Sequence, residues 1–161
     1  MAEDEPLNIA IELFQDAYRH QMKGDLNEAA ELYRQSIEAY PTAEAYTFLG
    51  WTYSFMGDYD AAIAECQHAI EVDPDFGNPY NDIGAYLIEK GEVDEAIPWL
   101  EKAMGALRYD NPAFPFFNLG RVWELKHNFA RALAFYQKAV EIDPHYTLAI
   151  TGIHRLRAMF N

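Results

Sequence analysis

The sequence has a single cysteine and no long apolar run. With Cys66 as the only cysteine among 161 residues, neither an intramolecular disulfide nor a thiolate metal cluster can form. No stretch approaches the roughly 20 apolar residues that cross a bilayer. Residues 1–6 also lack the basic start and apolar run of a secretory signal. We therefore expect a cytoplasmic protein in a reducing compartment.

Basic residues are few: 12 lysines and arginines stand against 26 aspartates and glutamates, which gives a net charge of −14. Such a chain repels phosphate backbones and anionic lipid surfaces, so we expect neither nucleic acid nor a membrane as partner. The imbalance is uneven, because residues 1–120 carry 6 basic and 23 acidic side chains, whereas residues 121–161 carry 6 and 3. The C-terminal segment is thus the basic end of an acidic molecule.

Residue patterns that support catalysis or metal binding are also missing. The five histidines are scattered, and no two of them lie four residues apart in the arrangement that binds zinc on one helix. No serine has a histidine–acid pattern beside it, and no glycine-rich phosphate loop occurs. We therefore expect no cofactor, no metal and no enzymatic activity.

The sequence does contain an internal repeat of about 34 residues, marked by three short signals. A Leu-Gly or Ile-Gly pair is the first, a glycine before an acid is the second, and a proline is the third. They fall at Gly50, Gly84 and Gly120, at Gly24, Gly57 and Gly91, and at Pro41, Pro74 and Pro144. Glycine within a helix indicates close approach of a neighbour, glycine after a helix supplies a cap and turn, and proline ends a helix. Each unit is predicted to be a helix, a tight turn, a second helix and a stop.

This pattern resembles the tetratricopeptide repeat family. The clearest unit, residues 43–76, matches the family at Tyr46, Leu49, Gly50, Tyr53, Gly57, Tyr59, Ala62, Ala69 and Pro74. The resemblance implies an all-α, right-handed α-solenoid of about four helix–turn–helix units at 7–42, 43–76, 77–112 and 113–146. An acidic tail at 1–6 precedes them, and a capping helix at 147–161 follows. Helices are expected near 7–23, 27–40, 43–56, 60–72, 77–90, 94–108, 113–126, 130–142 and 147–159.

The resemblance also implies that the first helix of each unit lines a concave groove that grips partners. On a helical wheel of about 100° per residue, the repeated positions form the stripe that packs on neighbouring helices, here called the packing stripe; in the helix from Ala43 it consists of Tyr46, Leu49, Gly50 and Tyr53. The opposite face of the first helices carries many aromatic side chains. The expected groove residues are Phe14, Tyr18, Phe48, Trp51, Phe55, Asn78, Asn81, Asp82, Phe114, Phe117, Asn118 and Arg121. Exposed apolar patches usually mark contact surfaces. The alternative is that several of these rings pack on one another or on the second helices as ordinary core.

The expected function is a non-catalytic adaptor that binds a peptide or a partner protein in this aromatic-rich groove. The ligand should be apolar, with a basic residue placed to meet Asp82. Some relatives hold the C-terminal carboxylates of heat-shock chaperones with a clamp of Lys, Asn and Arg, and the matching positions here lack the clamp's lysine and arginine. Two alternatives remain open: a self-assembling scaffold that forms a weak homo-oligomer through its opposite charges, and a small acidic secretion chaperone.

Overall fold

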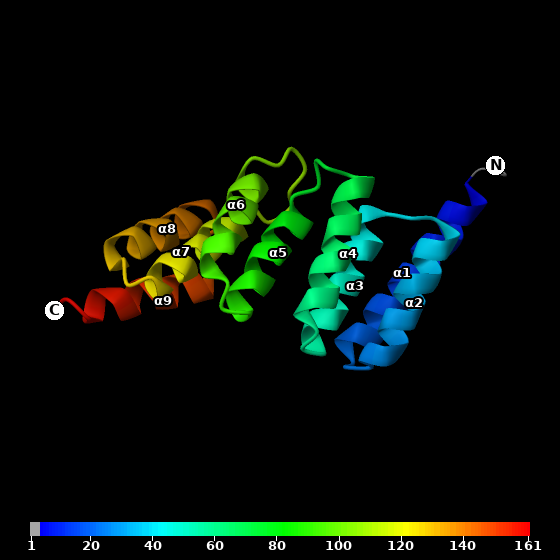
Figure 1. Ribbon diagram of the computed structural model, residues 1–161, viewed down its shortest axis with the longest axis horizontal. Helices are drawn as coiled ribbons and strands as arrows, with labels where there is room; N and C mark the ends of the chain where they lie inside the picture. The colour runs from blue at the N-terminus through cyan, green and yellow to red at the C-terminus, as the bar shows by residue number, and fades with distance from the viewer. Residues whose placement is uncertain (1–3) are drawn as a thin grey trace.

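The computed structural model describes residues 4–161, and that part of the chain consists of nine α-helices without a strand. The helices are α1 (Glu5–Met22), α2 (Leu26–Ala39), α3 (Ala43–Phe55), α4 (Tyr59–Val72), α5 (Asn78–Glu89), α6 (Val93–Met104), α7 (Phe114–Leu125), α8 (Phe129–Ile142) and α9 (Thr147–Ala158). The first eight form four consecutive pairs, and α9 lies alone at the C-terminal end (Figure 1). The all-α solenoid predicted from the repeats is therefore confirmed.

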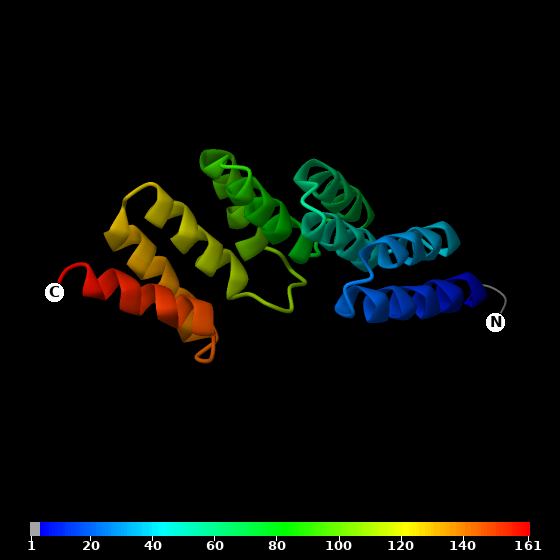
Figure 2. The same ribbon diagram turned by 90° about the horizontal axis from the view of Figure 1, so that it is seen from below.

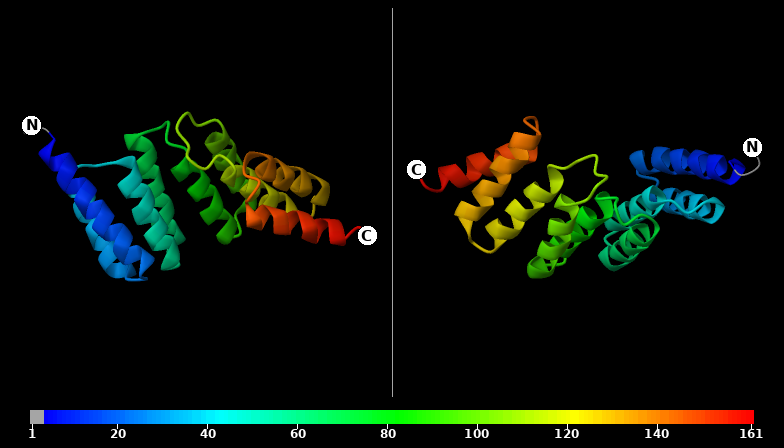
Figure 3. Two further views of the ribbon diagram at one scale, coloured as in Figure 1. Left: turned by 180° about the vertical axis from the view of Figure 1, so that it is seen from behind. Right: turned by 90° about the horizontal axis from the view of Figure 1, so that it is seen from above.

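The pairs stack along one axis, and the two termini lie at opposite ends of the molecule (Figure 1). Seen from below, the stack is an arch in which α1 and α9 form the two arms, and the segment between α6 and α7 lies between them (Figure 2). The views from behind and from above show the same arrangement (Figure 3). This curvature brings residues from distant repeats to one inner side.

The turn within each pair depends on a residue with positive φ. Gly24, Gly57 and Gly91 have φ values of 85°, 80° and 81°. Glycine adopts this left-handed conformation without the penalty that a Cβ imposes, and it ends a helix there. In the fourth pair the same place is taken by His127, with a φ of 59°. The glycine–acid signals of the sequence thus correspond to the tight turns.

A second set of glycines marks places where the two helices of a pair touch. A Cβ added at Gly50 would lie 2.8 Å from the carbonyl oxygen of Ala62 on α4. At Gly84 an added Cβ would collide with Leu100, and at Gly120 with the ring of Tyr136. The prediction that the repeated Leu-Gly glycine permits close helix approach is confirmed in all three pairs.

Two expected boundaries differ from the structure. The helix expected at 94–108 ends at Met104, because the following segment bonds to another part of the chain. The amide of Arg108 donates to the carbonyl of Asp75 at 3.0 Å, and the amide of Gly77 donates to the carbonyl of Arg108 at 2.8 Å. The tail expected at 1–6 is also shorter, since α1 begins at Glu5; residues 1–3 lie outside the described residues.

The segment 105–113, here called the linker, is further fixed by the side chain of Arg108. Its guanidinium forms ion pairs with Asp73 at 2.6 Å and Glu44 at 2.8 Å. The same group stacks over the ring of Phe76, with 4.2 Å between Cζ and the ring centroid. These contacts hold the linker against the end of α4 and the start of α3, and they position the residues that follow beside the inner side of the arch.

Candidate functional site

A cavity of about 330 Å³ opens on the inner side of the arch. We call it the central cavity. It is built by four helices and the linker, because α1, α3, α5 and α7 converge there. Its lining residues are Tyr18, Thr47, Phe48, Trp51, Asn78, Asp82, Asn111 and Phe114. Half of the twelve residues expected in a groove therefore lie around one cavity, although they come from all four predicted units.

The wall of the central cavity formed by α1 and α3 is aromatic. The rings of Phe48 and Trp51 meet edge to face with centroids 5.6 Å apart, and those of Tyr18 and Phe48 do so at 6.0 Å. Tyr18 remains 41% exposed, whereas Phe48 and Trp51 are partly buried. Phe55 stacks on Trp51 at the rim and is 59% exposed. A continuous apolar strip thus reaches solvent at this wall.

Phe14 packs as core, which is the alternative that the sequence left open for these rings. Its ring lies 5.1 Å from that of Phe48 and 5.4 Å from that of Tyr33, and it packs against the core between α1 and α2. It therefore contacts Phe48 from the side of the core and does not line the cavity.

Two of the expected groove asparagines face each other. The side-chain amide of Asn118 on α7 donates to the Oδ1 of Asn81 on α5 at 3.0 Å, and both residues are buried. Arg121 continues this chain, because it donates to the Oδ1 of Asn118 at 3.2 Å and pairs with Glu89 at 2.7 Å. These groups join α5 to α7, so their hydrogen-bonding capacity is largely used within the protein.

Asp82 lies in the central cavity without a cation beside it. Among the ion pairs of residues 4–161, none includes this carboxyl group. Its hydrogen bond comes from the amide of Asn81, at 3.5 Å. Burial disfavours the ionised form and raises the pKa of Asp82 to about 7, an effect that the Asn81 hydrogen bond partly offsets. A carboxyl group in this state gains from any cation that enters the cavity.

Other polar atoms near Asp82 also have no partner. The Oδ1 of Asn78, on the same face of α5, is buried without a hydrogen bond, as are the hydroxyls of Tyr86 and Tyr109. Burial, with the nearby Asp82 carboxyl as a second cause, raises the pKa of both tyrosines. Buried polar groups are nearly always hydrogen-bonded, so the Oδ1 of Asn78, which alone of these three groups belongs to a residue that lines the central cavity, is an acceptor that a ligand can use.

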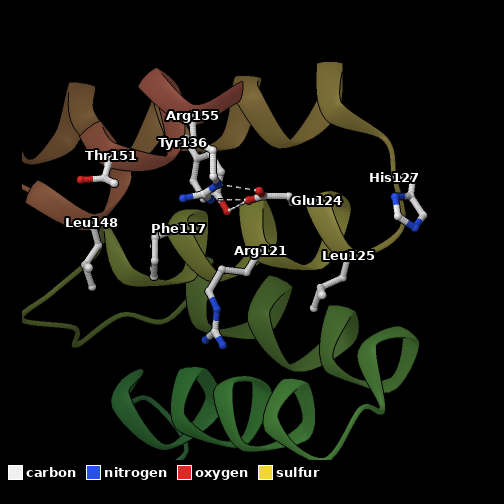
Figure 4. Close-up of a pocket in the computed structure, with 9 residues that line it drawn as sticks. All are labelled: Phe117, Arg121, Glu124, Leu125, His127, Tyr136, Leu148, Thr151 and Arg155. Atoms are coloured by element: carbon white, nitrogen blue, oxygen red, sulfur yellow. Dashed lines mark hydrogen bonds and ion pairs between the residues drawn. The ribbon is translucent and has the colours of Figure 1, made fainter. Parts of the chain in front are cut away.

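A second cavity of about 550 Å³ lies between α7 and α9 (Figure 4). Arg155 on α9 binds both carboxylate oxygens of Glu124, at 2.9 and 2.7 Å, and the hydroxyl of Tyr136 donates to the same carboxylate at 2.7 Å. Phe117 and Arg121, both expected in the groove, line this cavity instead of the central one. Figure 4 shows Arg121 pointing away from the Glu124–Arg155 pair toward α5.

The contribution of α9 to this second cavity was not expected from the sequence. Thr151 and Arg155 hold the positions in α9 that Thr47 and Trp51 hold in α3. The helical wheel applied to the first helices would have found them, had the last helix been treated as the first helix of a fifth unit.

Within the described residues, no cluster of three or more potential metal ligands occurs. No helix there is both long enough and apolar enough to span a membrane. Cys66 is fully buried between α3 and α4, and burial raises the pKa of its thiol well above the usual value. The thiol therefore packs as a small apolar group.

Comparison with known families agrees with the repeat pattern. Tetratricopeptide repeat models match residues 43–76, 78–106 and 113–146, which is more than half of the chain. The chain therefore belongs to the tetratricopeptide repeat family. Such repeats are protein-interaction modules, so the chain is a protein–protein interaction adaptor of this family.

The curated relatives are much longer proteins. The small glutamine-rich tetratricopeptide repeat-containing protein 2 of Mycosarcoma maydis is 29% identical over 102 residues, which is 63% of this chain and 29% of that protein. The protein SGT1 homolog of Oryza sativa subsp. japonica is 41% identical over 78 residues, 48% of this chain and 21% of that protein. The chain thus spans less than a third of either relative.

Solved structures share the fold at low identity. PilF of Pseudomonas aeruginosa superimposes with a TM-score of 0.87 at 20% identity, covering 94% of this chain and 69% of that one. YrrB, described as a tetratricopeptide repeat protein with an unusual peptide-binding site, has a TM-score of 0.69 at 22% identity and covers 88% and 73%. Identity at this level shows the common solenoid fold alone.

Proposed function

We propose that the chain binds an extended segment of a partner protein along the inner side of its arch, with the central cavity as the main point of contact. Apolar side chains of the partner lie on the aromatic wall of Tyr18, Phe48 and Trp51, and a basic side chain meets Asp82. The proposal rests on one observation. The carboxyl group of Asp82 has no cation next to it, and it lies in the same cavity as partly exposed aromatic rings.

In the free protein, apolar surface on this wall stays exposed and the carboxyl group of Asp82 has no cation beside it. Burying apolar surface yields about 25 cal/mol per Å², and the exposed parts of Tyr18 and Phe55 offer such surface. A cation beside Asp82 favours the ionised carboxylate, which burial otherwise disfavours. Binding hot spots are enriched in tryptophan and tyrosine within well-packed pockets. Trp51 fits that description, because it lies between Phe48 and Phe55 on the cavity wall.

The proposal is tested by selecting peptides from a displayed library on the purified protein. Selected peptides should share apolar residues around a lysine or arginine. Trp51→Ala should weaken their binding by about 2 kcal/mol, or roughly 30-fold, because truncation of an interface anchor costs this much. Fluorescence anisotropy of labelled peptides measures the dissociation constants.

The matched control is Tyr40→Ala, since Tyr40 is an aromatic side chain with 44% exposure at the end of α2 and lies outside the central cavity. Its peptide affinity should equal that of the unchanged protein, and circular dichroism should show both variants folded. If Trp51→Ala lowers the melting temperature strongly while its folded fraction binds normally, Trp51 is core and the proposed groove is wrong at this residue.

A second candidate function, self-assembly, is favoured by the charge distribution. Exposed acidic side chains at Asp4, Glu5 and Glu12 lie on or beside α1, while the exposed Arg157 lies on α9 at the other end of the arch. The C-terminal end also exposes apolar side chains, with Leu148 at 61% and Phe160 at 68%. Contacts between unlike ends can repeat from one copy to the next, so they produce open chains instead of closed dimers.

The assembly proposal predicts a mass that depends on salt. Surface charges are screened beyond about 10 Å at 0.1 M ionic strength, so oligomers held by unlike ends should dissociate as salt rises. Sedimentation velocity at low and high salt measures the mass distribution. If the protein is a monomer at both salt concentrations, the proposal of self-assembly is wrong.

A further inference from the structure

The groups that surround the central cavity include acceptors and aromatic faces but no cation. The acceptors are the carboxylate of Asp82 and the buried, unpartnered Oδ1 of Asn78, one turn apart on α5. The rings of Tyr18, Phe48, Trp51 and Phe114, together with the polar residues Thr47 and Asn111, line the rest. The carboxyl group favours a cationic ligand over an anionic one, and its arrangement with the rings discriminates between the cationic side chains that a partner can offer.

The three common cationic groups differ in the number and arrangement of their donors. A guanidinium is planar, carries five N–H donors, is always charged and stacks on aromatic rings. A lysine ammonium is compact and strongly hydrated, so more hydration is lost when it enters an apolar cavity. A trimethylammonium has no donor and would leave Asn78 without a partner. The arrangement of two acceptors beside aromatic faces therefore suits the guanidinium best.

The protein itself contains the same combination in a filled state. The guanidinium of Arg108 bonds Asp73 and Glu44 while it stacks 4.2 Å over the ring of Phe76. Arg131 likewise stacks 4.2 Å over the ring of Trp123. In the central cavity the carboxylate and the rings are present, but no arginine of the described chain pairs with Asp82.

Building on the proposed function, we propose that the central cavity is an arginine-binding site, in which an arginine side chain of the partner bonds Asp82 and Asn78 and stacks on the aromatic wall. The cavity volume of about 330 Å³ suits one long side chain, and the flanking residues of the partner run outward over Phe55 and Tyr18. The groove thus selects segments that carry arginine at one fixed place.

The test uses small probes, so that it does not depend on the identity of the partner. N-acetyl-arginine amide, the lysine and trimethyllysine equivalents, and N-acetyl-citrulline amide are titrated into the labelled protein. Nuclear magnetic resonance follows the indole N–H of Trp51 and the side-chain amide of Asn78. Citrulline is the matched control, because it keeps the shape of arginine without its charge.

The arginine probe should shift both resonances and bind at least fivefold more tightly than the lysine and trimethyllysine probes, and citrulline should produce no shift. Asp82→Asn should weaken the arginine probe at least tenfold. Asp110→Asn, at an exposed acid of the linker, should leave it unchanged. Circular dichroism verifies that both variants are folded.

Equal or tighter binding of lysine or trimethyllysine overturns the arginine assignment, as does binding of citrulline or an unaltered affinity in Asp82→Asn. The absence of shifts with every probe overturns it too. The peptides selected from the display library test separately whether the groove binds a partner segment. If their binding depends on Trp51 but does not depend on an arginine in the peptide, the proposed function is supported and the arginine site is wrong.

Discussion

Replacing Gly50 with leucine is expected to destabilise the protein by 3 kcal/mol or more, at or beyond the upper end of the roughly 1–3 kcal/mol typical of overpacking. The reason is the identity of the atom that a side chain would meet. A Cβ at this position would lie 2.8 Å from the carbonyl oxygen of Ala62 and 3.3 Å from the sulfur of Cys66. Backbone cannot rotate aside as a side chain can, so α3 and α4 would have to separate. Urea denaturation followed by circular dichroism measures the loss.

Gly105→Leu provides the control for this prediction. Gly105 ends α6 with a φ of −93°, and the nearest atom to an added Cβ is 3.9 Å away. The same change of residue there should alter the free energy of unfolding little. Equal losses at Gly50 and Gly105 would show that close approach of α3 and α4 is not the reason for the repeated glycine.

Asp82→Asn is expected to stabilise the protein, and the gain should depend on pH. The folded pKa of Asp82 is raised from 3.8 to about 7, so the folded state holds more protons than the unfolded state between these values. Stability contributed by the protonated carboxyl is complete below pH 3.8 and is lost as pH rises through about 7. This rise in pKa corresponds to an upper limit of about 4 kcal/mol, at 1.36 kcal/mol for each unit of pKa. The variant Asp82→Asn has no carboxyl group to ionise, so its stability does not fall for this reason as pH rises.

Urea denaturation of the variant and the unchanged protein at pH 4 and pH 8 tests this prediction. The difference in unfolding free energy should be small at pH 4 and large at pH 8. Tyr86, Tyr109 and Cys66 keep their protons throughout, because burial raises their pKa values. A difference that is equal at both pH values would mean that the carboxyl at Asp82 is not held in its neutral form by burial.

A stabilising variant at the proposed contact point bears on function. Residues that serve binding are often retained at a cost in stability. If Asp82→Asn gains stability and also loses the arginine probe, the two results together identify a carboxyl kept for recognition. Gained stability with unchanged binding would instead leave the burial of Asp82 without a functional reason.

The repeat and its turns could be predicted from the sequence because they depend on local chemistry. Gly24, Gly57 and Gly91 are required by positive φ values, and Gly50 by contact within one pair of helices. The end of α6 could not be found in this way. It depends on the bond that the amide of Arg108 donates to Asp75 and the bond that its carbonyl accepts from Gly77, and local propensity does not report such distant partners.

The helical wheel identified the aromatic wall of the central cavity, since Phe48 and Trp51 lie opposite the packing stripe of one helix. It could not show that Asn81 and Asn118 would bond to each other, because that contact depends on how closely α5 approaches α7. Nor could it show that Asn111 would close the cavity from the linker. Relations within a helix were predictable, whereas relations between repeats needed the structure.

The linker also has a mechanical consequence. A stack of repeats that contact only their neighbours behaves as a spring, and each joint contributes to its bending. Here the backbone bonds of Arg108 to Asp75 and Gly77, together with its ion pair to Glu44, stiffen the joint between the second and third units. The same linker carries Asn111 to the wall of the central cavity. The joint between the second and third units, which lies beside the central cavity, therefore resists bending more than a joint held by packing alone.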